Sequence, residues 1–257
     1  MATSKNKSKK INKKTNLKKK KIRVKIIKWT SLILLVIGAI LLLLLSDIFN
    51  IKEINVINNN RISSEEIIKL SGIQVNDNIF KFLKFKAKDS IKSNPYVENV
   101  KIHRKINGTV EIDVEERTPT YMIEKEENYF YINNQGYILE QNSEKLEAPT
   151  IEGFVTKELI PGNRLEIADL KKLNIVIQIM QAAKSKEIAE KISKINVESD
   201  YDYIITMEEE QKTVHFGNGT RINDKITKII PVLEDNVDVA GEIFVKDINK
   251  VYFRGDV

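Results

Sequence analysis

The chain has 257 residues, of which 42% are apolar and 30% are charged, and it contains no cysteine and two histidines, His103 and His215. The apolar content supports one or two packed domains and excludes a wholly disordered chain. The lack of cysteine excludes disulfides, cysteine-ligated metals and a thiol nucleophile, and two histidines leave little for a histidine-based metal site.

The charge is distributed unevenly along the chain. Residues 1–28 carry 13 Lys or Arg and no acid, whereas the remaining 229 residues hold 29 basic and 36 acidic side chains. A like-charged block with little apolar content cannot offset its ordering entropy, so we predict a disordered basic tail over 1–28. Attraction to anionic lipid is the favoured role for it. Nucleic-acid binding is not expected, because no aromatic residues are interleaved with the lysines.

An uncharged run of 18 residues, WTSLILLVIGAILLLLLS, occupies 29–46. At about 1.5 Å per residue it spans about 27 Å, close to a hydrocarbon core of about 30 Å. The run is longer than the apolar part of a cleavable signal and lacks a small-x-small site after it. We therefore predict a retained transmembrane signal anchor. The basic flank keeps the N terminus cytoplasmic and places the C terminus outside the cell membrane.

Residues 47–117 are predicted to form a small α+β domain in the order strand, helix, helix, strand, strand. After a β-prone segment at 51–56, Ser63 and Glu66 form a capping box in which each side chain can bond the other's backbone N–H. Two alternating strands joined at Asn107-Gly108 form a hairpin at the end of the unit. The second helix is expected to supply core side chains from Ile79, Phe80, Phe82, Leu83, Phe85, Ala87 and Ile91.

The order of these segments and several sequence stretches point to one family. The stretches are INVINNN, SSEEIIKLSGI, NDNIF, NPYVENVKIHRK and VEIDVEERTP. With the basic tail and single apolar run, they resemble the DivIB/FtsQ bacterial cell-division proteins, whose exterior part begins with a POTRA domain. Two turns depart from the family pattern: Asn59-Asn60 stands where Gly-Asn is common, and Asn107-Gly108 replaces a hairpin proline.

Residues 118–257 are predicted to form a second α+β domain, with a mixed or antiparallel sheet and helices on one side. NYFYINNQGYILE and APTIEG resemble family stretches, whereas Ile243-Phe244-Val245 departs from a common Ile-Asp-Leu. An apolar periodicity predicts a helix over 169–183, with Asp169 complementing its dipole. A second helix is expected at 222–233. Strands are expected at 192–197, 203–207, 213–216, 242–245 and 250–254.

The polar residues do not form a pattern typical of catalysis. Asp113, Glu115 and Glu116 cluster, but a solvated strand face or a Glu116–Arg117 pair is favoured over a hydrolytic site. For Arg104, pairing with strand acids is favoured over a functional contact. No metal-ligand spacing, nucleophile motif or nucleotide fingerprint occurs in the sequence. We therefore expect no catalytic residue, no metal site, no cofactor and no enzymatic activity.

The favoured function is binding through the last β-prone segment. Val251, Tyr252, Phe253 and Arg254 are the candidate partner-binding residues, because a terminal strand is often a sheet edge that can accept a partner strand. Packing of Tyr252 and Phe253 in the core is an equally weighted alternative. The resemblance implies a divisome scaffold at the septum. It would contact FtsL-like and DivIC/FtsB-like bitopic proteins and regulate septal peptidoglycan synthesis. A membrane-anchored cell-wall hydrolase or transferase, or a POTRA-bearing translocation component, is the alternative.

Overall fold

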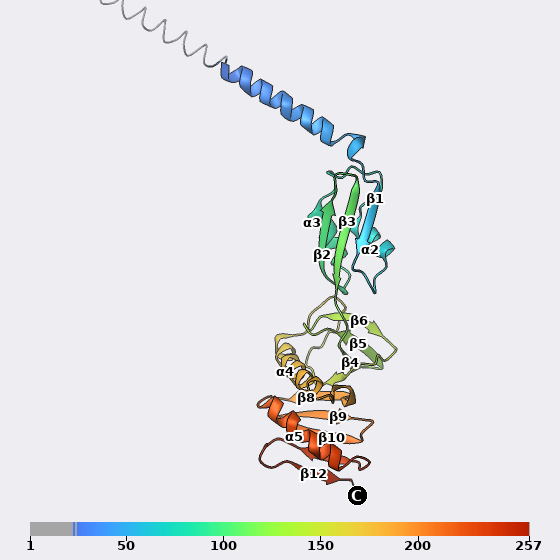
Figure 1. Ribbon diagram of the computed structural model, residues 1–257, viewed down its shortest axis with the longest axis vertical. Helices are drawn as coiled ribbons and strands as arrows, with labels where there is room; N and C mark the ends of the chain where they lie inside the picture. Colours follow the sequence, from blue (N-terminus) through green and yellow to red (C-terminus); the bar gives the residue numbers. More distant parts are fainter. Residues whose placement is uncertain (1–22, 24, 257) are drawn as a thin grey trace, which may run out of the picture.

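The computed structural model describes residue 23 and residues 25–256, so most of the predicted disordered tail, 1–28, lies outside the described residues. An apolar helix, Lys25–Leu44, has a mean hydropathy of 2.5 and none of it is buried, so it is long and apolar enough to cross a membrane. A short 3-10 turn, η1 (Asp47–Phe49), connects it to the first domain. Figure 1 shows the helix standing clear of the folded part of the chain.

The first domain has the predicted order of elements. They are β1 (Glu53–Ile57), α2 (Ser64–Ser71), α3 (Lys84–Ile91), β2 (Val97–Arg104) and β3 (Thr109–Glu116). The sheet order is β1-β3-β2, with β1 parallel and β2 antiparallel to the central strand. Ile67 of α2 and Ile91 of α3 pack into one cluster with Val100, Val110 and Ile112 of the sheet. The β-α-α-β-β prediction is confirmed.

The start of α2 differs in one detail from the capping box expected from the sequence. The Ser63 hydroxyl accepts from the Glu66 N–H at 3.2 Å, as expected. The Glu66 carboxylate instead accepts from the Asn94 side chain at 2.9 Å. Glu66 therefore ties α2 to the turn before β2. At its other end, the helix stops at Gly72, whose φ of 65° is the left-handed cap that glycine adopts without strain.

The second predicted helix of this domain is shorter than expected. It begins at Lys84, and Phe80, Leu83 and Phe85 are exposed by 43%, 50% and 59%. The preceding segment is held in turns instead, because the Asn78 side chain caps Phe80 and Ile79 donates its N–H to the Phe49 carbonyl. Three of the seven side chains assigned to the core are therefore at the surface.

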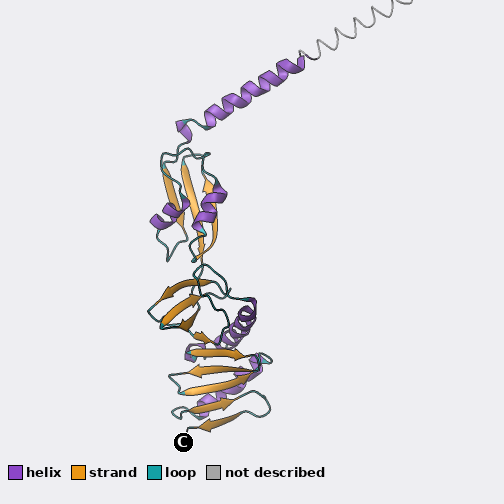
Figure 2. Ribbon diagram, turned by 180° about the vertical axis from the view of Figure 1, so that it is seen from behind, coloured by secondary structure: helices purple, strands orange, loops and turns teal. Residues whose placement is uncertain are grey.

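The second domain is built on one mixed sheet of nine strands in the order β12-β11-β10-β9-β8-β7-β4-β5-β6. The chain order of the strands is β4 (Tyr121–Lys125), β5 (Asn128–Ile132), β6 (Ile138–Asn142), β7 (Thr150–Glu152), β8 (Lys194–Ser199), β9 (Asp202–Met207), β10 (Lys212–Gly217), β11 (Gly241–Phe244) and β12 (Tyr252–Gly255). The helices are α4 (Ile167–Lys184) and α5 (Ile222–Asp235), with a 3-10 turn η2 (Ala189–Lys191). Both helices lie on one face of the sheet, as the opposite views in Figures 1 and 2 show.

Asp169 lies in the first turn of α4, where a carboxylate complements the helix dipole as predicted, and it has a second role that was not predicted. It is fully buried in α4, whose N-cap is Glu166. Its carboxylate accepts the backbone N–H of Val155 at 2.9 Å and of Thr156 at 2.7 Å, and also the Thr156 hydroxyl at 2.5 Å. A buried carboxylate needs such donors to offset its lost hydration. Asp169 therefore fastens the segment after β7 to the helix that covers the sheet.

The two domains are joined by packing as well as by the chain. Leu139 of β6 is 1% exposed and belongs to the hydrophobic cluster of the first domain, with Tyr137 packed against it. Across the same junction the Arg61 guanidinium pairs with Glu140 at 3.0 Å. The molecule is elongated, with the apolar helix at one end and the C terminus at the other (Figure 1).

Candidate functional site

The last strand, β12, is an edge of the nine-stranded sheet. Among the described residues its one hydrogen-bonded neighbour is β11, antiparallel, with Phe244 opposite Tyr252 and Glu242 opposite Arg254. Beyond the strand, the Asp256 N–H bonds to the Ala240 carbonyl. Because hydrogen-bonding direction alternates along an antiparallel strand, Tyr252 and Arg254 turn their backbone groups toward β11. The backbone N–H and C=O of Phe253 therefore point outward.

The opposite edge of the sheet is covered. In β6, Ile138 donates its N–H to the Asn163 carbonyl at 2.9 Å and accepts from Gly162 at 2.8 Å. Leu139, in the same strand, is buried in the cluster of the first domain. An edge covered by a loop and a neighbouring domain cannot readily accept a further strand. Of the two edge strands of this sheet, β12 is therefore the one available for strand addition.

The four candidate binding residues divide between the two faces of the sheet. Val251 and Phe253 are half-buried and pack against the main hydrophobic cluster. Tyr252 is 54% exposed and Arg254 is also exposed, paired with the Glu242 carboxylate of β11. The alternative that both aromatic residues pack in the core holds for Phe253 alone.

Tyr252 ends a row of stacked rings on the helix-free face. Its ring lies 4.8 Å from that of Phe244 with an interplanar angle of 12°, and Phe244 stacks on His215 at 4.5 Å and 2°. Offset stacking of this kind is worth about 0.5–1.5 kcal/mol per pair beyond area burial. The row, which we call the aromatic row (His215, Phe244 and Tyr252), runs across three strands and stops at the free edge.

A charged group anchors the inner end of the aromatic row. Asp202 lies 3.2 Å from Nδ1 of His215, pairs with Lys246, and accepts the Gly217 N–H at 3.0 Å. Burial raises the pKa of the Asp202 carboxyl, but the bonds from Lys246, His215 and Gly217 outweigh it and hold this pKa below its usual value. The arrangement keeps a carboxylate beside the imidazole and fixes its orientation.

Sequence reasoning missed the aromatic row. It treated His215 only as a possible metal ligand, and it noted Phe244 only as a departure from the family pattern. The signal was the alternation in β10 and β11, where Val214 and Ile243 are buried and their neighbours His215 and Phe244 are half-buried. Which residues meet across strands depends on the β10–β11–β12 register, and a single sequence does not reveal register.

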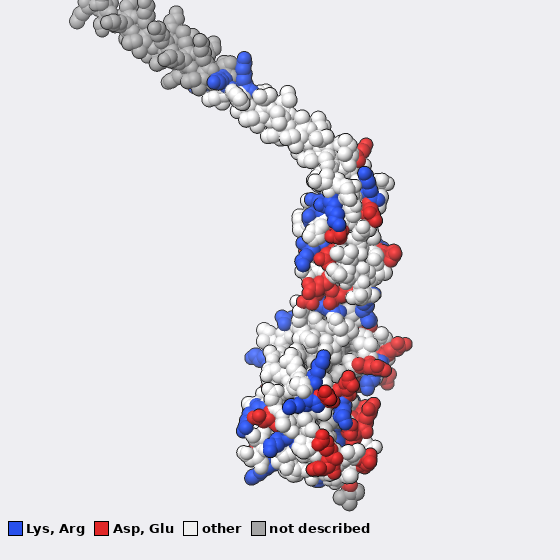
Figure 3. Space-filling model, viewed as in Figure 1, with Lys and Arg blue, Asp and Glu red and all other residues white. Residues whose placement is uncertain are grey.

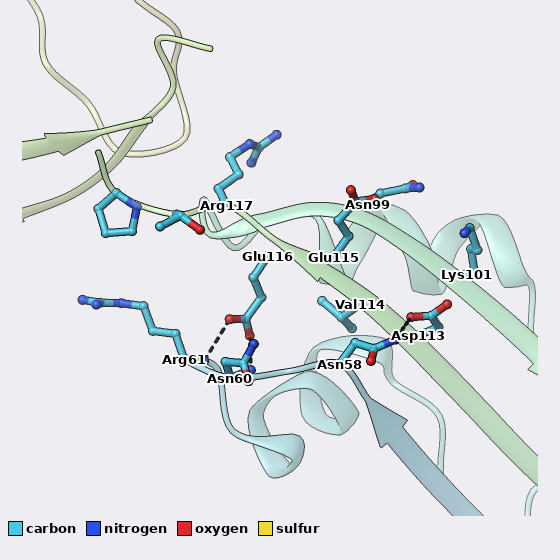
Figure 4. Close-up of a pocket in the computed structure, with 12 residues that line it drawn as sticks. Asn58, Asn60, Arg61, Asn99, Lys101, Asp113, Val114, Glu115, Glu116 and Arg117 are labelled. Atoms are coloured by element: carbon cyan, nitrogen blue, oxygen red, sulfur yellow. Dashed lines mark hydrogen bonds between the residues drawn. The ribbon is translucent and has the colours of Figure 1, made fainter. Parts of the chain in front are cut away.

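A cleft of about 660 Å³ lies on the first domain where β3 leads into the second. Glu116 points from the end of β3 to the turn after β1, and Asp113 points to Asn58 (Figure 4). The Glu116 carboxylate accepts three backbone N–H groups, from Asn60 at 3.2 Å, Arg61 at 2.8 Å and Ile62 at 3.0 Å. It therefore closes the turn between β1 and α2.

The prediction of a Glu116–Arg117 pair is wrong, because Arg117, the first residue after β3, directs its side chain away from that of Glu116. Arg117 turns away from Glu116 in Figure 4. Its guanidinium donates to the Pro95 and Val97 carbonyls, each at 2.7 Å, and lies 4.0 Å from the centre of the Tyr137 ring. Arg117 thus links the Asn-Pro-Tyr-Val turn to the second domain.

Arg104 also differs from its expected pairing with strand acids. It donates to the Phe82 carbonyl and lies 4.2 Å from the centre of the Phe82 ring. A guanidinium suits this double contact, because it is planar and carries several donors. The residue fixes the segment before α3.

The cleft carboxylates do not form a metal site. Over the residues that the structure describes, no group of three His, Cys, Asp or Glu side chains is arranged to hold a metal ion. Glu116 is engaged with backbone donors and Asp113 accepts from the Asn58 side chain at 2.8 Å. The arrangement accounts for these two carboxylates as structural groups at the domain junction.

Comparison with known proteins agrees with this architecture. A family model described as "POTRA domain, FtsQ-type" matches residues 49–117, and one described as "FtsQ/DivIB, C-terminal related" matches 118–255. The cell division protein DivIB of Clostridium tetani is 28% identical over 196 residues, covering 75% of this chain and 73% of the relative.

Two further relatives match shorter parts of the chain. The DivIB protein of Clostridium acetobutylicum is 36% identical over 51% of this chain and 53% of the relative. The cell division protein FtsQ of Syntrophotalea carbinolica is 29% identical over 51% of this chain and 47% of the relative. Because the C-terminal family model alone covers more than half of the chain, the protein belongs to the FtsQ/DivIB family of cell division proteins.

Proposed function

We propose that this protein is a non-enzymatic, single-pass membrane scaffold of the divisome that binds FtsL-like and DivIC/FtsB-like partners at the septum. Through them it regulates septal peptidoglycan synthesis carried out by other proteins. The observation that carries the proposal is the free edge of β12, the strand on which the aromatic row ends. A partner strand added there would gain backbone hydrogen bonds, and the exposed side chains would select the partner.

The proposed organisation has four parts: a basic cytoplasmic tail (1–28), a membrane anchor (29–46), a POTRA domain (47–117) and a C-terminal domain (118–257). Two features support this topology: the apolar helix, and the 13 basic residues of 1–28, which lie on the N-terminal side of the apolar run. Protease added to intact protoplasts should digest residues 47–257 and spare the tail. Protection of the folded part would contradict the orientation.

The proposal is tested by truncating the outermost ring of the aromatic row. Tyr252→Ala should weaken binding of the reconstituted FtsL-like and DivIC-like partners by about 30-fold, which corresponds to about 2 kcal/mol. The matched control is Tyr201→Ala, since Tyr201 is 86% exposed in the turn between β8 and β9, away from the edge. This control should leave affinity unchanged, and circular dichroism should show both variants folded.

A second variant tests the backbone contribution. Val251 lies two residues before Phe253, so its backbone N–H also points away from β11. Val251→Pro therefore removes one outward N–H from the edge. We expect a loss of about 0.5–1.5 kcal/mol, or roughly 2- to 13-fold in affinity. Folded variants at 251 and 252 that both keep full affinity would refute the edge as the interface and direct attention to the POTRA domain.

A further inference from the structure

The end of the first domain nearest the apolar helix carries exposed apolar side chains. The exposed fractions of Phe80, Leu83, Phe85 and Ile106 are 43%, 50%, 59% and 88%. We call these four residues the apolar rim. Large apolar side chains gathered on one surface are typical of a site that contacts a partner or a membrane.

Hydrogen bonds place this rim beside the point where the helix ends. The Asn78 side chain donates to the carbonyls of Leu44 at 3.0 Å and Ser46 at 3.2 Å, the last residues of the apolar run. The Phe80 ring packs on that of Phe49 with centroids 5.4 Å apart. Figure 1 shows the helix leaving the domain at this end.

The β2–β3 hairpin, which carries Ile106, reaches the same end. Gly108 accepts the Lys52 N–H at 2.8 Å, only a few residues after the helix. A Cβ on Gly108 would come 2.9 Å from the Asn50 carbonyl, so the hairpin tip lies directly on the connecting segment. The segment with Phe80, Leu83 and Phe85 and the hairpin tip with Ile106 are therefore both held against the residues that connect the apolar helix to β1.

Positive charge is concentrated along the part of the rim that precedes and begins α3. The segment 79–88, IFKFLKFKAK, has four lysines and no acid. Asp77 and Asp89 lie just outside this segment on either side. Burial, together with the neighbouring charges of Arg104 and Lys88, lowers the pKa of Lys84. Lysine and arginine lie on this part of the first domain in Figure 3.

We propose that the apolar rim inserts into the interfacial layer of an anionic lipid bilayer, with the lysines of 81–88 at the headgroups, and so holds the POTRA domain against the membrane. The inference rests on the proposed membrane anchoring, which brings the bilayer surface to the end of the helix. Aromatic and leucine side chains beside lysine are the combination that binds an anionic interface.

The test uses the full chain in nanodiscs, and the lack of cysteine allows single fluorophore labels. Labels at Phe85→Cys and Ile106→Cys report on the rim, and a label at Leu35→Cys reports on the apolar helix. The control is Tyr201→Cys in the second domain, which is 86% exposed. Quenching by brominated lipid is compared in discs containing phosphatidylglycerol and in discs of phosphatidylcholine alone.

In anionic discs we expect labels at 85 and 106 to be quenched at least fivefold more than the label at 201. Replacing Lys81, Lys84, Lys86 and Lys88 by Gln should reduce the quenching at 85 at least threefold. A quenched label at 35 with rim labels no more quenched than the control would overturn the inference and leave the anchoring intact. An unquenched label at 35 would overturn both. Equal rim quenching in both lipids would overturn the role of the lysines.

Discussion

Glu116 and Asp202 are carboxylates fixed by donors on neighbouring segments, one in each domain. Glu116 accepts three backbone N–H groups of the turn after β1, and Asp202 holds His215, Lys246 and the Gly217 N–H. A carboxylate with several donors stabilises the segment that supplies them, and removing it leaves those donors unpaired.

Glu116→Gln is expected to loosen the turn at 60–62. The amide side chain cannot accept all three N–H groups as the carboxylate does, so we expect a local loss of about 1–2 kcal/mol, a factor of about 5–30 in amide exchange at these residues. Hydrogen exchange measures it directly. Glu115→Gln is the control, because Glu115 is an exposed neighbour on the same strand, and it should leave the exchange unchanged. A similar effect of both variants would contradict the role of Glu116.

Asp202→Asn is expected to destabilise the second domain in a pH-dependent manner. Although burial opposes it, the bonds from Lys246, His215 and Gly217 hold the pKa of this carboxyl below its ordinary value. The stabilisation from the Asp202 carboxylate is therefore fully present above its pKa in the unfolded chain. It is lost as the pH falls through its lower pKa in the folded protein. Urea unfolding should give a gap of up to about 1 kcal/mol between wild type and variant at about pH 5. This difference in the free energy of unfolding should become smaller by about pH 2.5. A difference that becomes larger toward acid pH would contradict the expected pH dependence.

At the scale of elements, the sequence predicted the regular units well and the irregular ones poorly. Strands 192–197, 203–207 and 213–216 and the helix at 222–233 coincide closely with β8, β9, β10 and α5, because their apolar periodicities are strong. β4 and β7 were not predicted. The first has three consecutive buried residues, Tyr121 to Ile123, and the second has only three residues, so neither shows alternation.

The candidate site was predictable only in part, for a related reason. The last β-prone segment could be identified, and it is an edge strand. The aromatic row and the covering of β6 depend on strand register and on a domain contact, which arise from tertiary packing. The turns over 77–83 likewise result from contacts with residues 44–50, distant in sequence, which override the helical pattern there.

Gly153→Ala is expected to disturb the contact between β7 and β8. Gly153 has φ of 87°, and an added Cβ would lie 2.4 Å from the Glu198 backbone nitrogen. Strain and overlap should together cost about 2–4 kcal/mol in thermal or urea unfolding. Gly72→Ala is the matched control, because Gly72 has φ of 65° with open space around it, so the cost should be only about 1 kcal/mol. Equal losses of stability in the two variants would contradict a specific requirement for the close contact between Gly153 and the Glu198 backbone.

At the scale of the whole molecule, the chain separates its membrane end from its proposed binding end. The apolar helix leaves one end of the first domain, Leu139 and Arg117 join the two domains, and β12 lies at the far end beside the C terminus (Figure 1). If the protein is the scaffold that we propose, this arrangement presents its free sheet edge away from the membrane, where the exterior segment of a bitopic partner would bind.

Hydrogen exchange of the full chain, with and without the FtsL-like and DivIC-like partners, tests the central claim most directly. The outward N–H groups of Phe253 and Gly255 have no strand beside them among the described residues, so they should exchange rapidly in the free protein. Binding by strand addition should slow them at least tenfold, while the inward N–H of Arg254 changes little. Unchanged exchange at 253 and 255 in a saturated complex, with new protection in the POTRA domain, would contradict the account.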